Sequence, residues 1–503
     1  MKSNFIIIFD DYKNIVLGFF TKKDFLKVFI IGFLIYYIGL YALIRADIYY
    51  IDDYYVSIIS FSSWDHFSRF FATFLYKALF LFQDFVDISP FSQFLAIILL
   101  VLSGMILLYI IHNKFSIIGI ISTIPLGLSP YFLENMSYKF DSFFMAFSIF
   151  IAIFPFLFVY KRILFAISSI ICLILMYITY QASNSIYIVL GIYFSIYFCL
   201  VRENGVLFFL IFCFSFIAAS LVFKFFIMIP FDSYVSDKIV ANLLLGSINN
   251  LILYLKYLLL DLFNTQYFIL CIVLMICFIF SFASLSNQHK LISLLLSTKF
   301  IIFGILFSYG VYAVLQKPLF EPRAFIGIGL FIALLCITIT IKPRFYHSLL
   351  VILIVFNLIV FANAYGNAMQ KQSQYLHFRS ELLLRDLINI NNKDMIVILE
   401  GSIGMAYPTI KFINTYGEIA DRLIPKIMIK TSWDWSYAPL LHLKMPYKVY
   451  DKYCLNWRKN FSQKQIRNAK VLINNSYHSI KKLGSCYIVE LKEISNSFNR
   501  VFN

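Results

Sequence analysis

Residues 25–44 read FLKVFIIGFLIYYIGLYALI, and this stretch decides the class of fold. It contains one charged side chain, Lys27, and it has the length that crosses the hydrocarbon core of a bilayer, about 20 residues of α-helix. Similar runs recur along the chain, which has 503 residues, of which 61% are hydrophobic and 14% charged. A soluble globular domain has only about 45–50% apolar residues. The sequence therefore predicts a polytopic α-helical membrane protein.

The apolar runs predict about eleven transmembrane helices. We place them near residues 25–44, 91–111, 115–131, 141–160, 163–180, 184–201, 206–229, 267–284, 297–316, 324–341 and 346–362. Two other stretches, residues 67–82 and 241–263, alternate apolar and polar residues at helical spacing, which is typical of helices that lie in the plane of the membrane interface.

The loops between these runs predict the orientation, because short loops rich in Lys and Arg stay in the cytoplasm. Basic residues occupy alternate loops: Lys22, Lys23, Lys114, Lys161, Arg162, Arg202, Lys290, Lys342 and Arg344. The amino terminus is therefore expected in the cytoplasm, and an odd number of spans places the tail outside. The same assignment exports segments 45–90, 131–140, 230–266 and 317–323.

The composition changes near residue 363, which predicts two domains, a transmembrane domain over 1–362 and a C-terminal domain over 363–503. Residues 363–390 have the pattern of an amphipathic helix. The stretches MIVILEG (395–401), VLINNSY (471–477) and CYIVELK (486–492) have the pattern of short strands. We expect an α/β or α+β domain with a small core of its own.

Cys454 and Cys486 are the only two of the eight cysteines that lie outside the predicted spans. They form one disulfide if the tail lies in an oxidising compartment, and otherwise they are two unpaired thiols. The sequence leaves both alternatives open.

Charged residues gather in the segments predicted to face outward. Asp52 and Asp53 follow the first span in RADIYYIDDYY (45–55). Glu134, Lys139 and Asp141 lie in SPYFLENMSYKFDS (129–142), and Lys317, Glu321 and Arg323 lie in QKPLFEPRAF (316–325). Charges beside membrane spans are costly and usually face a bundle interior or a functional site. Acids and bases on one side of the membrane predict a site for an anionic group.

The order of these motifs resembles a known family. IDDYY (51–55), SSWDHFSR (62–69), SPYFLENMSYKFDS, EPR (321–323) and the tail opening NAYGNAMQKQSQY (363–375) are similar to the bacterial Gtr-type O-antigen glucosyltransferases, polytopic enzymes of the GT-C class. The resemblance covers most of the chain, and in the tail it holds only in outline.

The resemblance implies an inverting hexosyltransferase that moves glucose from undecaprenyl-phosphate glucose to lipid-linked O-antigen, an O-antigen modification of the kind that causes serotype conversion. It implies a multi-pass protein of the bacterial inner membrane with a periplasmic C-terminal domain. Its partners would be the lipid donor, the lipid-linked acceptor and membrane lipids. The resemblance also implies dependence on a separate transferase that makes the donor and on a flippase that carries it across the membrane.

The resemblance and the chemistry together suggest roles for the outward residues. A lipid phosphate leaves without a general acid, so one carboxylate suffices as base toward the acceptor hydroxyl. By resemblance this base is an Asp of the first outward loop. We expect Asp53 as the base and Asp52 as its polar support, with the reverse order open.

For the donor phosphate, Arg323 is the first candidate because a guanidinium presents a planar fork to phosphate oxygens. Arg69 and Lys139 come next, and Arg69 is alternatively a snorkelling residue on an interfacial helix.

The remaining candidates concern the acceptor sugar. Glu134 and Asp141 would hold the acceptor or position Lys139, and Asp141 is alternatively a helix N-cap. Trp64 would stack on a sugar ring, or it is one of the tryptophans common at membrane interfaces. Trp433 and Trp435 in the tail motif SWDW are better candidates for glycan binding, because a water-exposed domain has little other reason to carry paired tryptophans.

Several classes of function are disfavoured by the sequence. It contains no GxGxxG, no P-loop and no HExxH, and its cysteines lack zinc spacing, so neither a cofactor nor a metal is implied. A divalent ion bound by the carboxylates of Asp52 and Asp53 stays open as an alternative. Lys and Arg are dispersed rather than gathered in a stripe, so nucleic acid is not an expected partner. The remaining alternatives to a transferase are an O-antigen polymerase or ligase and a polysaccharide-lipid transporter.

Overall fold

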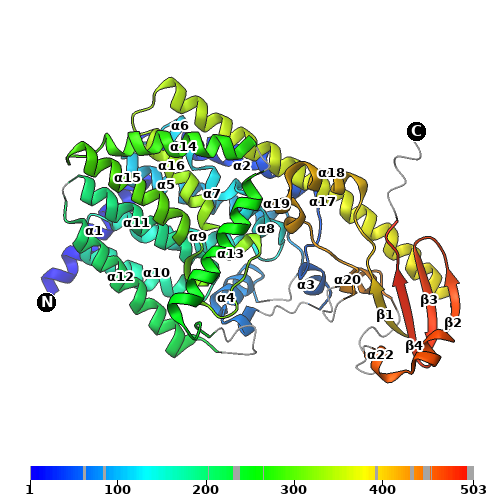
Figure 1. Ribbon diagram of the computed structural model, residues 1–503. Helices are drawn as coiled ribbons and strands as arrows, with labels where there is room; N and C mark the ends of the chain where they lie inside the picture. The colour runs from blue at the N-terminus through cyan, green and yellow to red at the C-terminus, as the bar shows by residue number, and fades with distance from the viewer. Residues whose placement is uncertain are drawn as a thin grey trace. The chain divides into compact units, whose positions relative to one another are not determined.

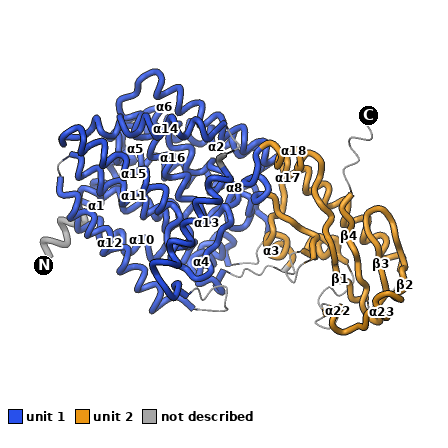
Figure 2. Tube along the Cα trace, in the orientation of Figure 1, with its two compact units in different colours: residues 1–45, 62–366, 416–423 blue, residues 46–61, 367–415, 424–503 orange. Residues whose placement is uncertain are grey.

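The computed structural model describes residues 2–59, 64–82, 86–201, 203–229, 238–263, 266–390, 395–430, 436–445, 454 and 456–494. The chain divides into two compact units, which Figure 2 colours separately. The helical unit comprises Met1–Arg45, Ser62–Gly366 and Tyr416–Leu423. The sheet unit comprises Ala46–Phe61, Asn367–Thr415 and Ile424–Asn503.

The helical unit is an assembly of apolar helices with short connections (Figure 1). Its elements are α1 (Lys2–Phe20), α2 (Phe25–Ala46), η1 (Trp64–Phe67), α4 (Phe70–Leu79), α5 (Phe91–His112), α6 (Ile117–Thr123), α7 (Pro125–Leu128), α8 (Pro130–Ser137), α9 (Ser142–Ile153), η2 (Phe154–Phe158), α10 (Arg162–Tyr177), η3 (Gln181–Ser183), α11 (Asn184–Leu200), α12 (Gly205–Val222), η4 (Phe223–Ile227), α13 (Leu243–Phe263), α14 (Gln266–Ala283), α15 (Lys290–Phe307), η5 (Gly310–Val314), η6 (Pro322–Ala324), α16 (Gly327–Ile339), the first part of α17 (Phe345–Ile390), and α19 (Glu418–Leu423).

Helix α16 lies at the centre of this unit. All of its residues from Gly327 to Ile339 are buried, and it packs against α6, α7, α11, α14 and α15. A helix that is apolar on every side must be surrounded by other helices or by lipid. The segment just before it, which includes η6, is therefore held against a rigid core.

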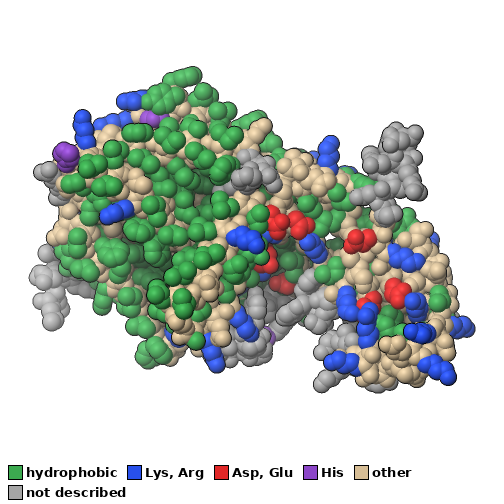
Figure 3. Space-filling model, viewed as in Figure 1, with side chains coloured by type: hydrophobic (Ala, Val, Ile, Leu, Met, Phe, Trp, Pro, Cys, Tyr) green, Lys and Arg blue, Asp and Glu red, His purple; other side chains and the backbone are tan. Residues whose placement is uncertain are grey.

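The outer helices of this unit expose apolar side chains. On α12, Val206, Leu210 and Phe214 are between 58% and 66% exposed. Figure 3 shows hydrophobic side chains over most of the visible face of the helical unit, whereas Lys and Arg gather over the sheet unit. Apolar surface on this scale is unfavourable in water. It is the surface expected of helices that contact lipid.

Among the described residues, eight helices are long and apolar enough to cross a membrane. There are nine if the pair Ile117–Leu128 and Pro130–Ser137, bent by 65°, counts as one span. The structure thus supports a polytopic helical membrane protein. The number of described helices that are long enough to cross a membrane is smaller than the expected number of about eleven transmembrane helices.

The difference has a local cause. The runs near 141–160, 163–180 and 324–341 form the shorter helices Ser142–Phe158, Arg162–Tyr177 and Gly327–Ile339. The run 115–131 breaks before Pro130, which cannot donate a backbone hydrogen bond. Conversely, the stretch 241–263, expected in the interface plane, forms α13, whose residues Leu243–Asp261 are long and apolar enough to cross.

Helix α17 is a single helix of 46 residues, roughly 69 Å long at 1.5 Å per residue. It merges two predicted elements, the span 346–362 and the amphipathic helix 363–390. The division between the two units falls inside it, between Gly366 and Asn367. Gly366 lies where α17 touches α2, since an added Cβ would come within 2.3 Å of the backbone nitrogen of Leu43.

The sheet unit contains a four-stranded sheet in the order β1-β4-β3-β2. Its strands are β1 (Ile396–Gly401), β2 (Lys470–Asn474), β3 (His478–Leu483) and β4 (Cys486–Leu491), with β1 parallel to β4 and the other pairs antiparallel. Its helices are α3 (Asp53–Ile59), the second part of α17, α18 (Tyr407–Tyr416), α20 (Ala438–His442), α22 (Trp457–Asn460) and α23 (Gln463–Arg467). Three strands lie where the sequence predicts them, and β3 is additional.

One face of the sheet packs on α17. Leu383 and Leu387 of the helix share a buried cluster with Val397, Ile480 and Val489 of the strands. A second, smaller cluster contains the disulfide between Cys454 and Cys486. The structure therefore selects the disulfide from the two alternatives that the sequence leaves open for these cysteines.

Candidate active site

The first part of the site is built by α8 and η6. Glu134 of α8 is 2% exposed, and its carboxylate accepts hydrogen bonds from the Arg323 guanidinium at 2.6 Å and from the Arg323 backbone N–H at 2.8 Å. The same guanidinium donates to the hydroxyl of Tyr138. Pro130 begins α8 and Pro322 begins η6, and each proline fixes its own φ angle. Glu134 therefore holds both the backbone and the side chain of Arg323.

Arg69 forms the second part of the site. Its Nε donates to the side-chain oxygen of Gln181 at 3.1 Å, and its guanidinium stacks on the rings of Phe67 and Tyr180, 5.1 and 4.9 Å from their centroids. Gln181 also donates to the backbone carbonyl of Phe67. These partners are uncharged, so they position Arg69 without neutralising it.

Tyr180 connects the two parts. It is 4% exposed, and the charges of Arg69, Arg323 and Glu134 all act on its hydroxyl. The set Arg69, Glu134, Tyr138, Tyr180 and Arg323 is called the arginine cluster below. The charge of Glu321 also acts on the Glu134 carboxylate, so the feature of this site that suits an anion is its pair of guanidinium groups rather than a net charge. The structure thus brings together three of the predicted site residues, namely Arg323, Arg69 and Glu134.

Lys139 has a different partner from those expected. It is 4% exposed, and its ammonium forms a salt bridge with Asp87 at 3.0 Å. Burial raises the pKa of Asp87, but hydrogen bonds from Ser89 and the Lys139 ammonium outweigh it and hold the pKa below its ordinary value. The sequence reasoning did not name Asp87 as a partner of Lys139, and Glu134 is engaged with Arg323.

Two further predicted residues lie in packed surroundings. Asp141 directly precedes α9 and is 9% exposed, yet its side chain does not cap the helix amides as the N-cap alternative requires. Trp64 is 5% exposed, and its rings contact those of Tyr76 and Phe144. In this structure Trp64 has a packing role. Trp433 and Trp435 lie outside the described residues.

A second ion pair was missed by the sequence reasoning. Arg422 of α19 donates to both carboxylate oxygens of Asp261, at 3.0 and 2.8 Å, and also to the backbone carbonyl of Phe320. The hydroxyl of Tyr131 donates to Asp261 at 3.1 Å. Asp261 is an acid at the end of an apolar helix, which is a detectable signal. Arg422 is one of many charged tail residues, and its sequence context does not distinguish it.

Asp52 and Asp53 belong to the sheet unit, so they are described within it. Asp53 is the first residue of α3 and is 1% exposed, and its carboxylate accepts the N–H of Tyr50 at 3.0 Å. Asp52 is exposed, and its backbone carbonyl accepts the N–H groups of Tyr55 and Val56. The two carboxylates thus differ in accessibility, which makes their roles separable by experiment.

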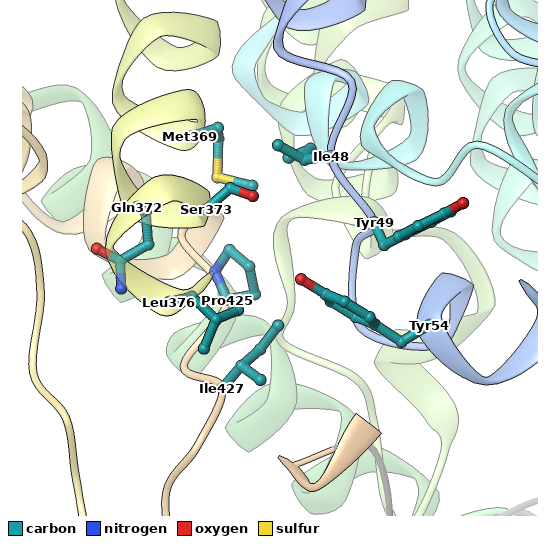
Figure 4. A pocket seen from close by; sticks show the side chains of 9 residues that line it. All are labelled: Ile48, Tyr49, Tyr54, Met369, Gln372, Ser373, Leu376, Pro425 and Ile427. Carbon is teal, nitrogen blue, oxygen red and sulfur yellow. The ribbon is translucent and has the colours of Figure 1, made fainter. Parts of the chain in front are cut away.

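The loop that carries Asp52 and Asp53 packs closely on α17. Figure 4 shows a small cavity between them, with Tyr49 and Tyr54 on one side and α17 side chains on the other. Its volume is about 20 Å³, enough for about one water molecule and not for a sugar. Burial raises the pKa of Tyr54, and the charge of Asp53 raises it further, so this hydroxyl keeps its proton and does not compete as a base. The cavity is lined by Ile48, Tyr49, Tyr54, Met369, Gln372, Ser373, Leu376, Pro425 and Ile427.

A bundle of apolar helices, with a cluster of two half-buried arginines in the segments between them, defines a polytopic membrane protein with a site suited to an anion. The chain belongs to the family described as glucosyl transferase GtrII, whose model matches residues 40–334, more than half of the chain. The match confirms the resemblance to Gtr-type enzymes and implies a glucosyltransferase. It covers the two aspartates and the arginine cluster. No curated protein and no solved structure is similar enough to the chain to count as a match.

Proposed function

We propose that this glucosyltransferase takes glucose from undecaprenyl-phosphate glucose and transfers it to lipid-linked O-antigen at the periplasmic face of the inner membrane. The observation that carries the proposal is the arginine cluster, where Arg323 and Arg69 flank a shared tyrosine and Glu134 fixes one of them. A site with two guanidinium groups, built by segments between apolar helices, suits a phosphate whose lipid chain lies in the membrane.

The chemistry needs few groups. The bond between the glucose C1 and the phosphate oxygen breaks, and C1 forms a bond to the acceptor hydroxyl from the opposite face, which inverts the configuration. The acceptor proton passes to a carboxylate, and negative charge develops on the leaving phosphate. Arg323 and Arg69 would stabilise that charge, because preorganised cations act where charge develops in the transition state. This scheme calls on no metal or cofactor.

The base belongs to the pair Asp52 and Asp53, with Asp53 as our first choice. Its carboxylate is held by the Tyr50 N–H, so its orientation is fixed. Asp52 is the accessible member and would support it or take its place. Trp433 and Trp435 remain candidates for binding the acceptor glycan. Asp141 and Lys139 are outside the arginine cluster and would act on the site only through the segments that hold it.

Two observations support the outer face as the location. The disulfide between Cys454 and Cys486 is expected in an oxidising compartment. The distribution of basic loops favours a cytoplasmic amino terminus, and the odd count of nine spans in the described part of the chain, with the bent pair as one span, then exports the tail. If the lipid donor is loaded with glucose in the cytoplasm, the protein depends on a separate transferase that makes the donor and on a flippase that carries it to the outer face. A polymerase, a ligase and a transporter are less well supported, because the family match implies transfer of glucose.

The test is transfer in a reconstituted system. Purified protein in lipid nanodiscs receives undecaprenyl-phosphate glucose labelled in the sugar, together with lipid-linked O-antigen. We expect labelled glycan from wild type, and a loss of about 10²–10³-fold in Arg323→Ala, the effect typical of removing one preorganised donor. Arg323→Lys keeps the charge and should retain part of the activity.

Arg344→Ala is the matched control, because Arg344 is an exposed arginine hydrogen-bonded to Tyr346 and lies away from the cluster. It should leave the rate unchanged. Transfer from a nucleotide sugar with no requirement for the lipid donor would overturn the proposal. So would full activity of Arg323→Ala at matched protein levels.

A further inference from the structure

We propose that Arg422 is a positioning residue of the phosphate site, which it organises by holding the turn at residues 320–323. The ligand of that site rests on the function proposed above, while the positioning itself is independent of it. Arg422 lies outside residues 40–334, so the family match does not include it. It nevertheless belongs to the helical unit, through the segment Tyr416–Leu423.

Arg422 makes hydrogen bonds with both terminal nitrogens of its guanidinium. One end donates to both oxygens of Asp261, and the other donates to the carbonyl of Phe320. Its planar group also stacks against the rings of Tyr257 and Phe325, 4.8 and 5.1 Å from their centroids. The Arg422 side chain is 10% exposed and that of Asp261 is 1% exposed. Such a guanidinium has a single geometry, because a planar fork fixes both hydrogen-bond directions at once.

The turn that Arg422 holds carries Arg323. Arg422 binds the carbonyl of Phe320 at the start of the turn, and Glu134 binds the backbone N–H of Arg323 at its end. The two residues that follow the turn, Ala324 and Phe325, donate to the carbonyls of Glu321 and Pro322 inside it. The backbone between Phe320 and Arg323 is therefore fixed from both sides by side chains of other elements.

Helix α8 supports both ends. Tyr131 donates to Asp261, the partner of Arg422, and Glu134 three residues later pairs with Arg323. Residues three apart on a helix lie on the same face. α19 also packs against α8, α13 and η6. Helix α8 thus contacts both carboxylate–arginine pairs, through Tyr131 and Glu134. The pair that contains Arg422 contributes position, because Arg422 binds the backbone of the turn that carries Arg323.

The kinetic test compares Arg422→Met and Arg422→Lys with wild type in the nanodisc assay. A misplaced Arg323 should weaken donor use and leave acceptor use intact. We expect the KM for undecaprenyl-phosphate glucose to rise about 10–100-fold in Arg422→Met, the loss that a displacement near 1 Å can cause. The KM for the acceptor should stay within about twofold of wild type. Arg422→Lys can pair with Asp261 but lacks the fork, so it should show an intermediate donor KM.

A second variant separates positioning from stability, because Arg422→Met leaves the carboxylate of Asp261 buried without its cation. The double variant Asp261→Leu/Arg422→Met removes both charges, and apolar replacement of a buried pair is often neutral or stabilising. We expect this double variant to unfold at a temperature near that of wild type and still to show the raised donor KM. A donor KM restored to the wild-type value would overturn the proposal.

Hydrogen exchange of the backbone amide of Arg323 gives a readout that does not depend on activity. This amide donates to Glu134 and should exchange at least about tenfold faster in the stable double variant, because the turn is released at Phe320. If wild type does not use the lipid donor, the proposed function fails while faster exchange still supports the positioning role. Unchanged exchange in the double variant would refute that role whatever the substrate is.

Discussion

At the residue scale, the main question is which carboxylate of the first outward loop accepts the proton. Asp53 is buried and oriented by the Tyr50 N–H, whereas Asp52 is exposed and caps α3 with its backbone carbonyl. Asparagine at either position keeps an oxygen for hydrogen bonding and removes the charge. The two substitutions therefore test basicity with little disturbance of the local backbone.

We predict that Asp53→Asn lowers glucosyl transfer about 10²–10⁴-fold, the usual contribution of a general base, and that Asp52→Asn lowers it less. The measurement is the O-antigen structure of cells that express each variant, with membrane levels matched by immunoblot. If Asp52→Asn alone abolishes the glucose branch, the two roles are reversed. Unchanged glycan in both variants would remove the pair from the mechanism.

The same scale shows why some site residues could be predicted from the sequence. Arg323, Arg69 and Glu134 stand out because each lies in a short polar segment between apolar runs, where a charge is costly. Their common neighbour Tyr180 does not stand out among 35 tyrosines. The pairing of Lys139 with Asp87, and of Arg422 with Asp261, joins positions 52 and 161 residues apart. Such pairs depend on tertiary packing, which periodicity does not contain.

At the element scale, apolar length predicts that a helix forms but not where its backbone breaks. The stretch 115–131 reads as one span, and the prolines at 125 and 130 divide it into α6, α7 and α8, which places Glu134 beside η6. Strands β1, β2 and β4 follow from their β-branched residues. β3, HSIKKL, carries two lysines and becomes a strand because β2 and β4 pair with it on both sides.

The disulfide belongs to this scale because it ties β4 to the segment that precedes α22. It closes a loop of 32 residues, and the chain-entropy model gives about 3–4 kcal/mol for a loop of that length. We predict that Cys454→Ala/Cys486→Ala lowers the free energy of unfolding of the sheet unit by about this amount. The free energy of unfolding is measured by limited proteolysis at increasing denaturant concentration, with cleavage between β2 and β4 as the signal.

The matched control replaces Cys277, a free cysteine of α14 that lies in the helical unit, by Ala. It should leave the stability of the sheet unit unchanged. A double variant as resistant to proteolysis as wild type would mean that the bond contributes no measurable stability.

At the scale of the whole molecule, the predicted orientation gives a labelling pattern. Lys464 is an exposed residue of the sheet unit, and Lys290 is an exposed residue at the start of α15, in a loop expected in the cytoplasm. We predict that a cysteine at position 464 reacts with a membrane-impermeant maleimide in intact spheroplasts. A cysteine at position 290 should react only after the membrane is permeabilised. The opposite labelling pattern would show that the protein has the inverse orientation, with the two aspartates on the cytoplasmic side.

The division of the chain into units also constrains how the protein is made. Residues 46–61 of the sheet unit are synthesised early, and the rest of that unit is synthesised only after residue 366. The last segment of the helical unit, which contains α19, is synthesised after most of α18, a helix of the sheet unit. Neither unit is complete until the ribosome has passed residue 423. A transcript truncated after residue 334, where the matched region ends, would therefore lack Arg422 as well as the sheet. Arg422 is synthesised after every member of the arginine cluster, so under the positioning role proposed above the turn that carries Arg323 is held from both sides only late in membrane insertion.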